Sequence, residues 1–150
     1  MRCSDVTIER VRSEYIDSVY EIERLSFKDP YPKYLFTMYA VISPETFLVA
    51  KVLDRVVGYV IGVVRGKLLG HIVSIAVHPE FRGRGIGKLL LSRCIEELRR
   101  LGVRVVRLEV RVSNYIAIRM YEELGFRKAY IVRGYYSDGE DALVMYLLLP

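Results

Sequence analysis

The amino-acid sequence predicts a mixed α/β (α+β) fold, with seven strands in a mainly antiparallel sheet and about four helices on its two faces. Segments in which apolar residues alternate with polar ones, or run without interruption, predict strands, and apolar residues at helical spacing predict amphipathic helices. Their order is strand, two helices, three strands, helix, strand, helix and two strands. The chain has 150 residues, 52% of them hydrophobic, which is enough for one compact domain over residues 1–150.

The first strand is expected at residues 6–11, where apolar and polar side chains alternate. Ser13 can cap a helix, and the helical spacing gives that helix an inward face of Tyr15, Val19, Ile22 and Leu25. Residues 29–32 contain two prolines and break the chain. A second short helix then begins near Pro32, with an inward face of Leu35, Met38, Tyr39 and Ile42.

Two apolar segments, 47–53 and 56–64, flank Asp54-Arg55 and predict a hairpin. Residues 71–77 are almost wholly apolar, which is typical of a central strand covered on both faces. After a glycine-rich stretch, the amphipathic segment 88–101 predicts a helix that ends at Gly102 and buries Leu90, Cys94, Leu98 and Leu101.

The last third of the chain predicts one helix and three strands. Residues 106–112 alternate, so this strand has a polar face formed by Arg107, Glu109 and Arg111. Ser113-Asn114 can cap a helix that ends at Gly125 and carries Ala117, Tyr121 and Leu124. Strands at 126–132 and 142–149 follow, joined by a long aromatic and acidic loop, residues 133–141.

A glycine-rich hexapeptide, Arg82-Gly83-Arg84-Gly85-Ile86-Gly87, lies between the apolar strand and the amphipathic helix. Alternating glycines free the backbone of side-chain obstruction, so consecutive N–H groups can form a concave nest at the positive end of the helix. Arg82, Arg84 and Lys88 add full positive charges. The stretch therefore predicts a loop that holds the pyrophosphate of a cofactor without a metal.

Two common glycine-rich phosphate loops differ from this one in spacing. A dinucleotide-binding turn has the pattern G-x-G-x-x-G and an acidic residue about 20 residues further on, and a P-loop has G-x-x-x-x-G-K-S/T. The spacing here is G-x-G-x-G and fits neither. A glycine-rich turn with incidental basic residues is the structural alternative, and the flanking strand and helix favour the phosphate loop over it.

The composition limits where the protein is expected in the cell and which partners it is expected to bind. The net charge of +5 permits contact with nucleic acid but does not indicate it, because the basic residues are scattered. No stretch could span a membrane and the N-terminus lacks a signal-peptide core, so a cytoplasmic protein is expected. Cys3 and Cys94 are too few for a disulfide framework or a zinc site, and no metal is expected. Asn114 is the sole asparagine and glutamine is absent, which suggests a thermophilic source.

The hexapeptide, in this order of elements, resembles the pyrophosphate signature Q/R-x-x-G-x-G/A of the GNAT acetyltransferase superfamily, with Arg82, Gly85 and Gly87 at its fixed positions. Further stretches are similar to the RimI-like and archaeal protein N-terminal acetyltransferases. The first stretch is residues 108–114 with Ala117 and residues 121–126, and the second is residues 134–142. The third, residues 26–32, is similar more loosely. The resemblance covers nearly the whole chain.

The resemblance implies a sheet that splays after its fourth strand, residues 71–77, and acetyl-CoA as the cosubstrate in the resulting cleft. The pantetheine arm would pair with the exposed edge of that strand, and the pyrophosphate would meet the backbone N–H groups of residues 84–88. The cofactor-binding residues implied in this way are Ile75, Ala76, Val77, Arg82, Gly83, Arg84, Gly85, Ile86, Gly87, Lys88, Asn114 and Tyr121.

The resemblance also implies roles in transfer of an acetyl group to an amine. Glu109 is the candidate general base, acting through water, and a solvated glutamate paired with Arg107 or Arg111 is its structural alternative. His71 could cooperate with Glu109 or replace it, and these two ligands alone are too few to predict a metal. Tyr121 would protonate the departing thiolate, or be a core tyrosine. The backbone N–H of Ala76 is the candidate donor to the oxyanion.

On the substrate side, the resemblance places Asp29, Tyr31, Tyr135 and Tyr136 in two loops over the acceptor; tyrosines that pack these loops are the structural alternative. The leading functional prediction is an Nα-acetyltransferase that acts on protein N-termini, with ribosomal proteins among its plausible targets. Acetylation of lysine or a small amine is a second possibility, and a non-enzymatic RNA- or ribosome-associated module a distant third. A monomer or weak homodimer, with no membrane or direct nucleic-acid contact, is expected.

Overall fold

The computed structural model describes residues 5–150, so the predictions made for Cys3 and for the start of the chain lie outside the described residues. The strands are β1 (Val6–Arg10), β2 (Phe47–Val52), β3 (Arg55–Arg65), β4 (Leu69–Val77), β5 (Val105–Arg111), β6 (Arg127–Val132) and β7 (Ala142–Leu148). The helices are α1 (Ile16–Ser26), α2 (Lys33–Ile42), α3 (Ile86–Arg100) and α4 (Tyr115–Glu123), with 3-10 turns at Ser13–Tyr15 and Pro79–Phe81. The order of elements predicted from the sequence is confirmed.

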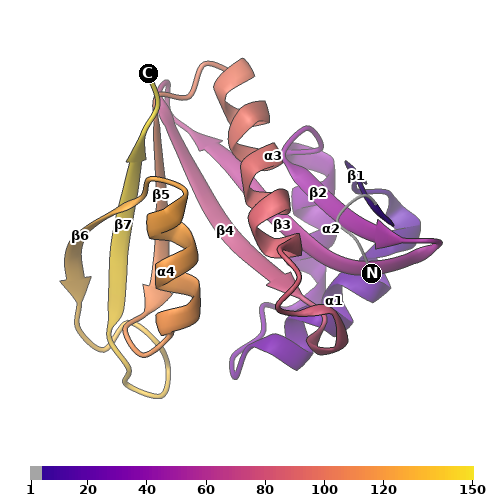
Figure 1. Cartoon of the computed structure of the whole chain (residues 1–150), viewed down its shortest axis with the longest axis horizontal. Coiled ribbons are helices and arrows are strands. Elements are labelled where there is room, and N and C mark those ends of the chain that lie inside the picture. The colour runs from indigo at the N-terminus through magenta and orange to yellow at the C-terminus, as the bar shows by residue number, and fades with distance from the viewer. Residues whose placement is uncertain (1–4) are drawn as a thin grey trace.

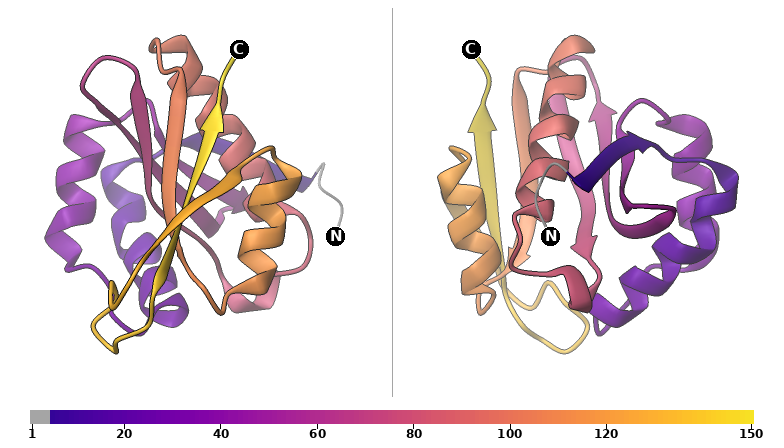
Figure 2. Two further views of the ribbon diagram at one scale, coloured as in Figure 1. Left: turned by 90° about the vertical axis from the view of Figure 1, so that its left-hand side faces the viewer. Right: turned by 45° about the vertical axis from the view of Figure 1, so that its right-hand side comes forward.

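The strands form one seven-stranded sheet in the order β1-β2-β3-β4-β5-β7-β6. Every neighbouring pair is antiparallel except β4 and β5, which are parallel. Helices α1 and α2 cover one face of the sheet, and α3 and α4 lie on the other (Figures 1 and 2). The mixed, mostly antiparallel sheet with helices on both faces is therefore as predicted.

The sheet splits between β4 and β5. The two strands pair only over three positions, from Leu69 opposite Val105 to His71 opposite Arg107. Beyond His71, β4 continues to Val77 beside β3 alone, and β5 continues to Arg111 beside β7 alone. The two strands diverge downward in Figure 1, as the splayed sheet requires. One edge of β4 is therefore left without a strand partner from residue 72 onward.

A bulge in β4 changes which face its side chains occupy. Ile61 pairs with Ser74 and Gly62 pairs with Ile72, so Val73 is an extra residue. Ile72 consequently packs in the core beneath α3, while Ser74 turns to the other face and contacts α1. Alternate residues of β4 are only half-buried, so the strand is less covered than its apolar sequence predicted. Its open edge on the β5 side gives the physical reason.

Three inward helix faces differ from the sequence predictions. In α1, Leu25 is 50% exposed and Ile16, Val19, Ile22 and Glu23 are buried. The 3-10 turn at Ser13–Tyr15 delays α1, and Ser13 makes no cap hydrogen bond.

In α2 only Phe36 is buried, and Ile42 is 61% exposed. Almost every residue of α2 is apolar, so periodicity could not select the face, and Phe36 occupies the core against Tyr20 and Tyr59. Leu101 lies beyond α3 and is 47% exposed.

Gly62 marks the closest approach of β3 to α3. A Cβ at this position would lie 2.7 Å from Cys94 Sγ, and the Cys94 side chain is fully buried. We expect Gly62→Ala to lower the free energy of unfolding by about 1–3 kcal/mol, because a packed core does not accept an added methyl group without strain. Chemical denaturation of both proteins measures the effect. The double variant with Cys94→Ala should recover part of the loss, and simple additivity would show that the strain does not arise at Cys94.

Candidate active site

The glycine loop bends sharply into the start of α3. Gly83 and Gly85 have φ angles of 79° and 81°, in the left-handed region that favours glycine. Gly85 is the N-cap of α3, and its carbonyl accepts the first helical bond, from the N–H of Leu89. The N–H groups of Ile86, Gly87 and Lys88 precede that bond and have no acceptor within the helix. The loop therefore presents backbone donors and the positive end of a helix dipole to an anion, as the pyrophosphate prediction requires.

The basic side chains of the loop make contacts of their own. The Nε of Arg82 donates to the carbonyl of Val77 at 2.8 Å, and its guanidinium donates to Ser26 Oγ at 3.0 Å. Arg84 lies over the ring of Phe81, and Lys88 lies 3.7 Å from Glu123 of α4. The side chain of Arg82 thus ties the loop to β4 and α1, and its predicted contact with the cofactor stays a prediction.

The register of β4 decides which backbone groups face the cleft. The N–H of His78 donates to Val57 of β3, and alternation along an antiparallel pair then turns the backbone of Ala76 toward β3 as well. Ile75 and Val77 turn theirs to the open edge. The predicted roles of Ala76 in pairing and in oxyanion binding are therefore corrected, because its N–H is directed into the sheet. The predicted pairing of Ile75 and of the Val77 N–H with the pantetheine arm stays a prediction. The Val77 carbonyl is already engaged by Arg82.

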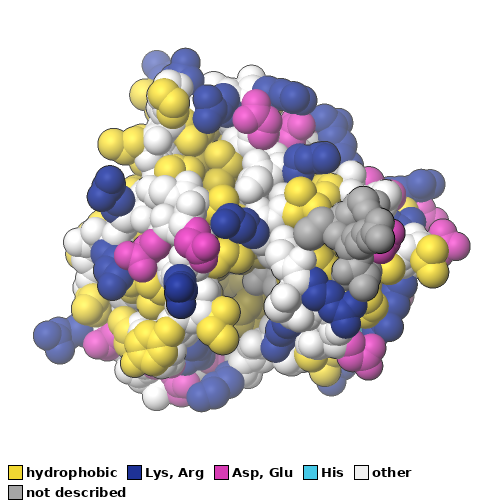
Figure 3. Space-filling view, in the orientation of Figure 1, with side chains coloured by type: hydrophobic (Ala, Val, Ile, Leu, Met, Phe, Trp, Pro, Cys, Tyr) yellow, Lys and Arg dark blue, Asp and Glu magenta, His cyan; other side chains and the backbone are white. Residues whose placement is uncertain are grey.

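Asn114 lies at the start of α4, across the split from β4. Its Oδ1 accepts a hydrogen bond from the N–H of Ala117 at 3.2 Å, which confirms the predicted cap. The side-chain amide nitrogen is the group left to contact a cofactor. Met120 of the same helix lies 3.5 Å from the position of a Cβ on Gly87, so α4 and the glycine loop flank the same opening. The surface is hollowed between these two elements (Figure 3).

Glu109 and His71 meet where β4 and β5 diverge. His71 Nε2 lies 2.8 Å from Glu109 Oε1, and Arg107 Nε donates to Glu109 Oε2 at 2.8 Å. Burial alone would raise the pKa of Glu109, but His71 and Arg107 outweigh burial and hold it below its ordinary value. Glu109 is thus an ionised carboxylate in a partly enclosed site. Within residues 5–150 no group of three or more metal-ligating side chains lies together.

The hydrogen bonds around His71 define its tautomer. Arg65 Nε donates to His71 Nδ1 at 3.1 Å, and a guanidinium can only donate, so Nδ1 carries no proton. The proton is then on Nε2, which donates to Glu109. In this arrangement His71 orients the carboxylate, and its one basic nitrogen is directed away from Glu109 toward Arg65. The geometry therefore favours Glu109 over His71 as the base.

We expect ¹⁵N NMR at pH 7.5 to show His71 as the Nε2–H tautomer, because the bonds from Arg65 and to Glu109 both require it. The chain has two histidines, so the His78→Gln variant leaves a single imidazole to assign. Arg65→Met should release a mixture of tautomers. A predominant Nδ1–H form in the unmodified protein would contradict the assignment.

Tyr121 is nearly enclosed, with 6% of its surface exposed, and packs beside Phe126. Burial raises the pKa of its phenol to about 12. Among residues 5–150 its hydroxyl has no hydrogen-bond partner. Tyr121 is therefore a core residue, as periodicity predicted, and its phenol keeps its proton at neutral pH.

The predicted substrate tyrosines come from the two predicted loops. Tyr135 and Tyr136 pack edge to face at 5.0 Å, and the guanidinium of Arg111 lies 4.1 Å from the ring centroid of Tyr136. Tyr31 is 40% exposed. Burial first, and then the charges of Tyr135 and Glu23, raise the pKa of Tyr31 to about 12, with Glu109 also contributing. These tyrosines therefore surround the outer side of the Glu109 site as neutral phenols.

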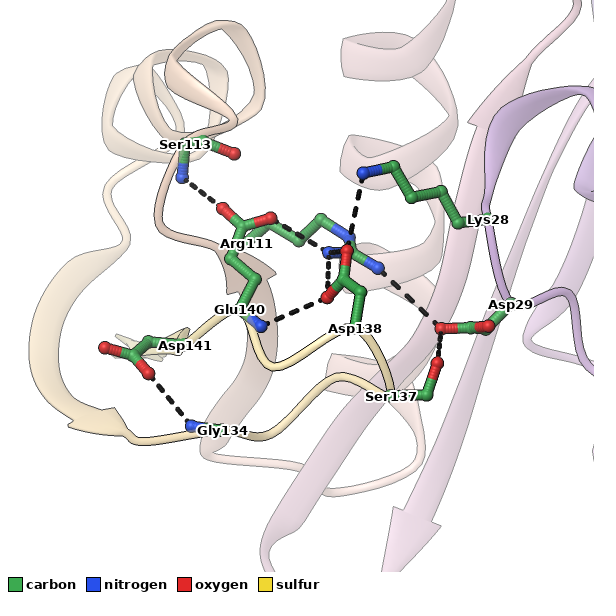
Figure 4. A network of polar contacts seen from close by, with 9 residues as sticks. All are labelled: Lys28, Asp29, Arg111, Ser113, Gly134, Ser137, Asp138, Glu140 and Asp141. Carbon is green, nitrogen blue, oxygen red and sulfur yellow. Dashed lines mark hydrogen bonds and ion pairs between the residues drawn. The ribbon is translucent and has the colours of Figure 1, made fainter.

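Arg111 contacts both the loop between α1 and α2 and the loop of residues 133–141 (Figure 4). It donates to both carboxylate oxygens of Asp138 at 3.0 and 2.9 Å, and to Glu140 at 2.9 Å. Asp29, from the loop between α1 and α2, lies 3.9 Å from Arg111 and accepts a hydrogen bond from Ser137. Lys28 lies 3.4 Å from Asp138. Asp29 thus takes part in a contact between loops, and its predicted role toward the acceptor stays a prediction.

We expect Arg111→Met to accelerate amide exchange in the loop 133–141 and to raise the KM for an acceptor several-fold, because one side chain holds both loops. Arg111→Lys should rescue only part of the effect, since Nη1 contacts Asp138 and Glu140 while Nη2 lies nearest Asp29, and lysine has a single nitrogen. The backbone N–H of Glu140 and then Arg111 lower the pKa of Asp138 to about 2. The contact is therefore complete above the ordinary value of 3.8 and is lost only as pH falls toward 2. Loop exchange that rises already between pH 7 and pH 5 would contradict it.

Comparison with known proteins identifies the family. The family model described as "Acetyltransferase (GNAT) family" matches residues 16–126. The chain belongs to the GNAT acetyltransferases. It is 39% identical to an N-alpha-acetyltransferase of Saccharolobus solfataricus, over 94% of this chain and 92% of that protein. Of solved structures, Ard1 from Thermoplasma volcanium is similar with a TM-score of 0.93, at 32% identity over 97% of this chain and 99% of that one. The ribosomal-protein-S18-alanine N-acetyltransferase from Escherichia coli is similar with a TM-score of 0.83, at 33% identity over 96% and 94% of the two chains.

The predicted GNAT resemblance is thus confirmed. Sequence reasoning missed the buried Glu23 of α1, although one signal was available. Val19, Ile22 and Glu23 share the i, i+3, i+4 spacing of one helix face, so a carboxylate falls at a core position. It also missed Arg65 and the role of Arg111, which depend on contacts across the sheet. In the described chain no helix has the length and apolarity needed to cross a bilayer.

Proposed function

We propose that this GNAT acetyltransferase transfers the acetyl group of acetyl-CoA to the free α-amino group of protein N-termini. The observation that carries the proposal is the position of Glu109. An ionised carboxylate, fixed by His71 and Arg107, lies at the point where β4 and β5 diverge. The glycine loop opens at one end of that split and the tyrosine loops lie over the other side. Cosubstrate and acceptor can thus approach one point from opposite faces of the sheet.

The residues present fit acetyl-CoA. The loop and the first turn of α3 provide N–H groups for its pyrophosphate, a Cβ on Gly83 would meet nothing within 4 Å, and the open edge of β4 at Ile75 and Val77 can pair with its amides. When bound, acetyl-CoA supplies an activated acetyl thioester.

The catalytic roles follow from the protonation states. A peptide α-amine has a pKa near 7.7–8.0, so the base has one proton to remove near neutral pH. Glu109 is ionised and accepts that proton, directly or through one water. Tyr121 keeps its proton, because burial raises its pKa to about 12, and it can protonate a leaving thiolate. An ammonium acceptor would first lose one proton to Glu109, directly or through water, and the neutral amine would then form the C–N bond. As the C–S bond breaks, Tyr121 would give its proton to the sulfur, and the second proton of the nitrogen would pass through water to restore Tyr121.

The nature of the acceptor rests on the loops and on the relatives. Tyr31, Tyr135 and Tyr136 lie on two loops that Arg111 joins, and aromatic side chains on such loops suit an extended peptide end. Because two of the similar proteins are named for N-terminal acetylation, one of them for a ribosomal protein, ribosomal proteins are plausible substrates.

Incubation with acetyl-CoA and short peptides, followed by thiol release, tests the proposal. Peptides with a free N-terminus should react, and the same sequences with a blocked N-terminus and a free lysine should not. Turnover confined to the blocked, lysine-containing peptides or to small amines would reassign the substrate within the family.

A further inference from the structure

We infer that Glu23 is a positioning residue for the acceptor: it fixes Tyr31 over the site by accepting a hydrogen bond from its backbone N–H. This inference rests on the proposed function, because it assumes that the loop carrying Tyr31 contacts the peptide. It concerns a buried carboxylate that the mechanism above does not use.

Glu23 is almost completely enclosed, with 1% of its surface exposed, on the face of α1 that packs against β3 and β4. Among residues 5–150 no basic side chain forms an ion pair with it. An ionisable group buried in this way is costly unless hydrogen bonds compensate it. An apolar residue would fill the same space at lower cost, so the acceptor oxygens of this side chain call for a reason other than packing.

Three donors satisfy the two oxygens of Glu23. Oε1 accepts from the hydroxyl of Tyr59 and, at 2.8 Å, from that of Ser74, and these two hydroxyls lie 2.9 Å from each other. Oε2 accepts from the N–H of Tyr31 at 3.1 Å. The side chain therefore connects the centre of the sheet, at the bulge of β4, to the loop between α1 and α2.

The sequence of that loop explains why such an anchor is needed. Pro30 and Pro32 have no N–H, so Tyr31 carries the only backbone donor among residues 30–32. A segment of this kind cannot hold itself by a ladder of backbone hydrogen bonds. The oxygen of Glu23 engages its single donor and so sets the position of the Tyr31 ring. The Tyr31 hydroxyl lies close enough to Tyr135 and Glu109 for both groups to raise its pKa.

The test separates this contact from general support of the core. Glu23→Leu has a similar size and no acceptor; Glu23→Gln retains an oxygen for Tyr31, and its NH₂ can donate to the two hydroxyls. Ser74→Ala is the matched control, because it removes a donor to Oε1 and leaves the bond to Tyr31 intact. For each variant three quantities are measured: exchange of the Tyr31 amide by NMR, the KM for a peptide, and the Kd for acetyl-CoA.

For Glu23→Leu we expect Tyr31 amide exchange at least about 10-fold faster and a peptide KM about 10-fold higher, equivalent to about 1.4 kcal/mol, with the acetyl-CoA Kd changed less than about 2-fold. Glu23→Gln should restore both quantities to within about 3-fold, and Ser74→Ala should leave both unchanged. Should Glu23→Leu not fold, Glu23→Asp carries the same test, because it is one methylene too short to reach all three donors.

An unchanged Tyr31 exchange rate in the leucine or aspartate variant would overturn the inference. So would an equal effect of Ser74→Ala, which would show that Glu23 acts only through the core. Failure of the proposed function is distinguishable, because the exchange experiment needs no turnover: inactivity of the unmodified protein toward every peptide would leave the Glu23–Tyr31 contact measurable.

Discussion

Glu109→Gln is expected to lower kcat by about 10²–10⁴-fold, the range associated with loss of a general base, while the Kd for acetyl-CoA changes less than about 2-fold. The amide cannot accept a proton at neutral pH, yet it keeps the shape of the side chain. The glycine loop and the β4 edge, which bind the cosubstrate, are not altered. Steady-state kinetics with a saturating peptide and isothermal titration with acetyl-CoA measure the two quantities.

Glu9→Gln is the matched control, because Glu9 is also a strand carboxylate that accepts a hydrogen bond, from Tyr15, but it lies on β1 away from the split. Its kcat should stay within about 2-fold of the unmodified protein. A kcat within about 3-fold for Glu109→Gln would transfer the role of base to water or to a group outside this cluster. His71 is a weaker candidate, since its free lone pair is directed to Arg65.

The low pKa of Glu109 also fixes the form of the pH profile. A depressed folded-state pKa keeps the carboxylate ionised down through mildly acidic pH, so Glu109 does not limit activity between pH 5 and 8. The decline of kcat/KM on the acidic side should instead follow the acceptor amine, near pH 7.7–8.0. The stability that Glu109 gains from His71 and Arg107 is present above the ordinary value of 4.5 and is lost as pH falls through the lower folded value.

Much of the fold could be predicted from the spacing of apolar residues and from the glycines that end helices. Strands with one polar face, such as β5, carry a strict alternation that only one register satisfies, and Gly102 and Gly125 have the positive φ expected at helix ends. The glycine loop was predictable because its function depends on the backbone. In each case the signal is local, and the structure needs nothing distant to realise it.

What could not be predicted depends on distant contacts. The apolar sequence of α2 is compatible with several inward faces, and only packing against Tyr20 and Tyr59 selects Phe36. The bulge that turns Ser74 toward α1 has no signature in the sequence 71–77, and it decides that Ala76 faces β3. Arg111 and Asp29 are far apart in the sequence, so their contact could not be read from either segment. The predicted role of Ala76 is corrected for this reason, because the direction of its N–H depends on the pairing with β3.

Gly85→Val is expected to weaken acetyl-CoA binding by at least about 100-fold. Gly85 has a φ of 81° and a ψ of 7° at the N-cap of α3, a conformation that costs an L-residue roughly 1–2 kcal/mol and a β-branched one more. The loop must either hold that strain or move. Movement would turn the N–H groups of Ile86, Gly87 and Lys88 away from the proposed pyrophosphate position. The added methyl groups would also occupy space beside that position.

Gly102→Val provides the matched control at the other end of the same helix. Gly102 has a φ of 95°, and a Cβ there would meet nothing within 4 Å, so valine imposes comparable strain without reaching the loop. Both variants should lose stability by a similar amount in thermal unfolding, and only Gly85→Val should lose acetyl-CoA in titration calorimetry. Equal weakening in both would attribute the loss to α3 as a whole. A tight complex with Gly85→Val would mean that backbone donors at this bend do not hold the pyrophosphate, and the location of the cosubstrate would then have to be found elsewhere.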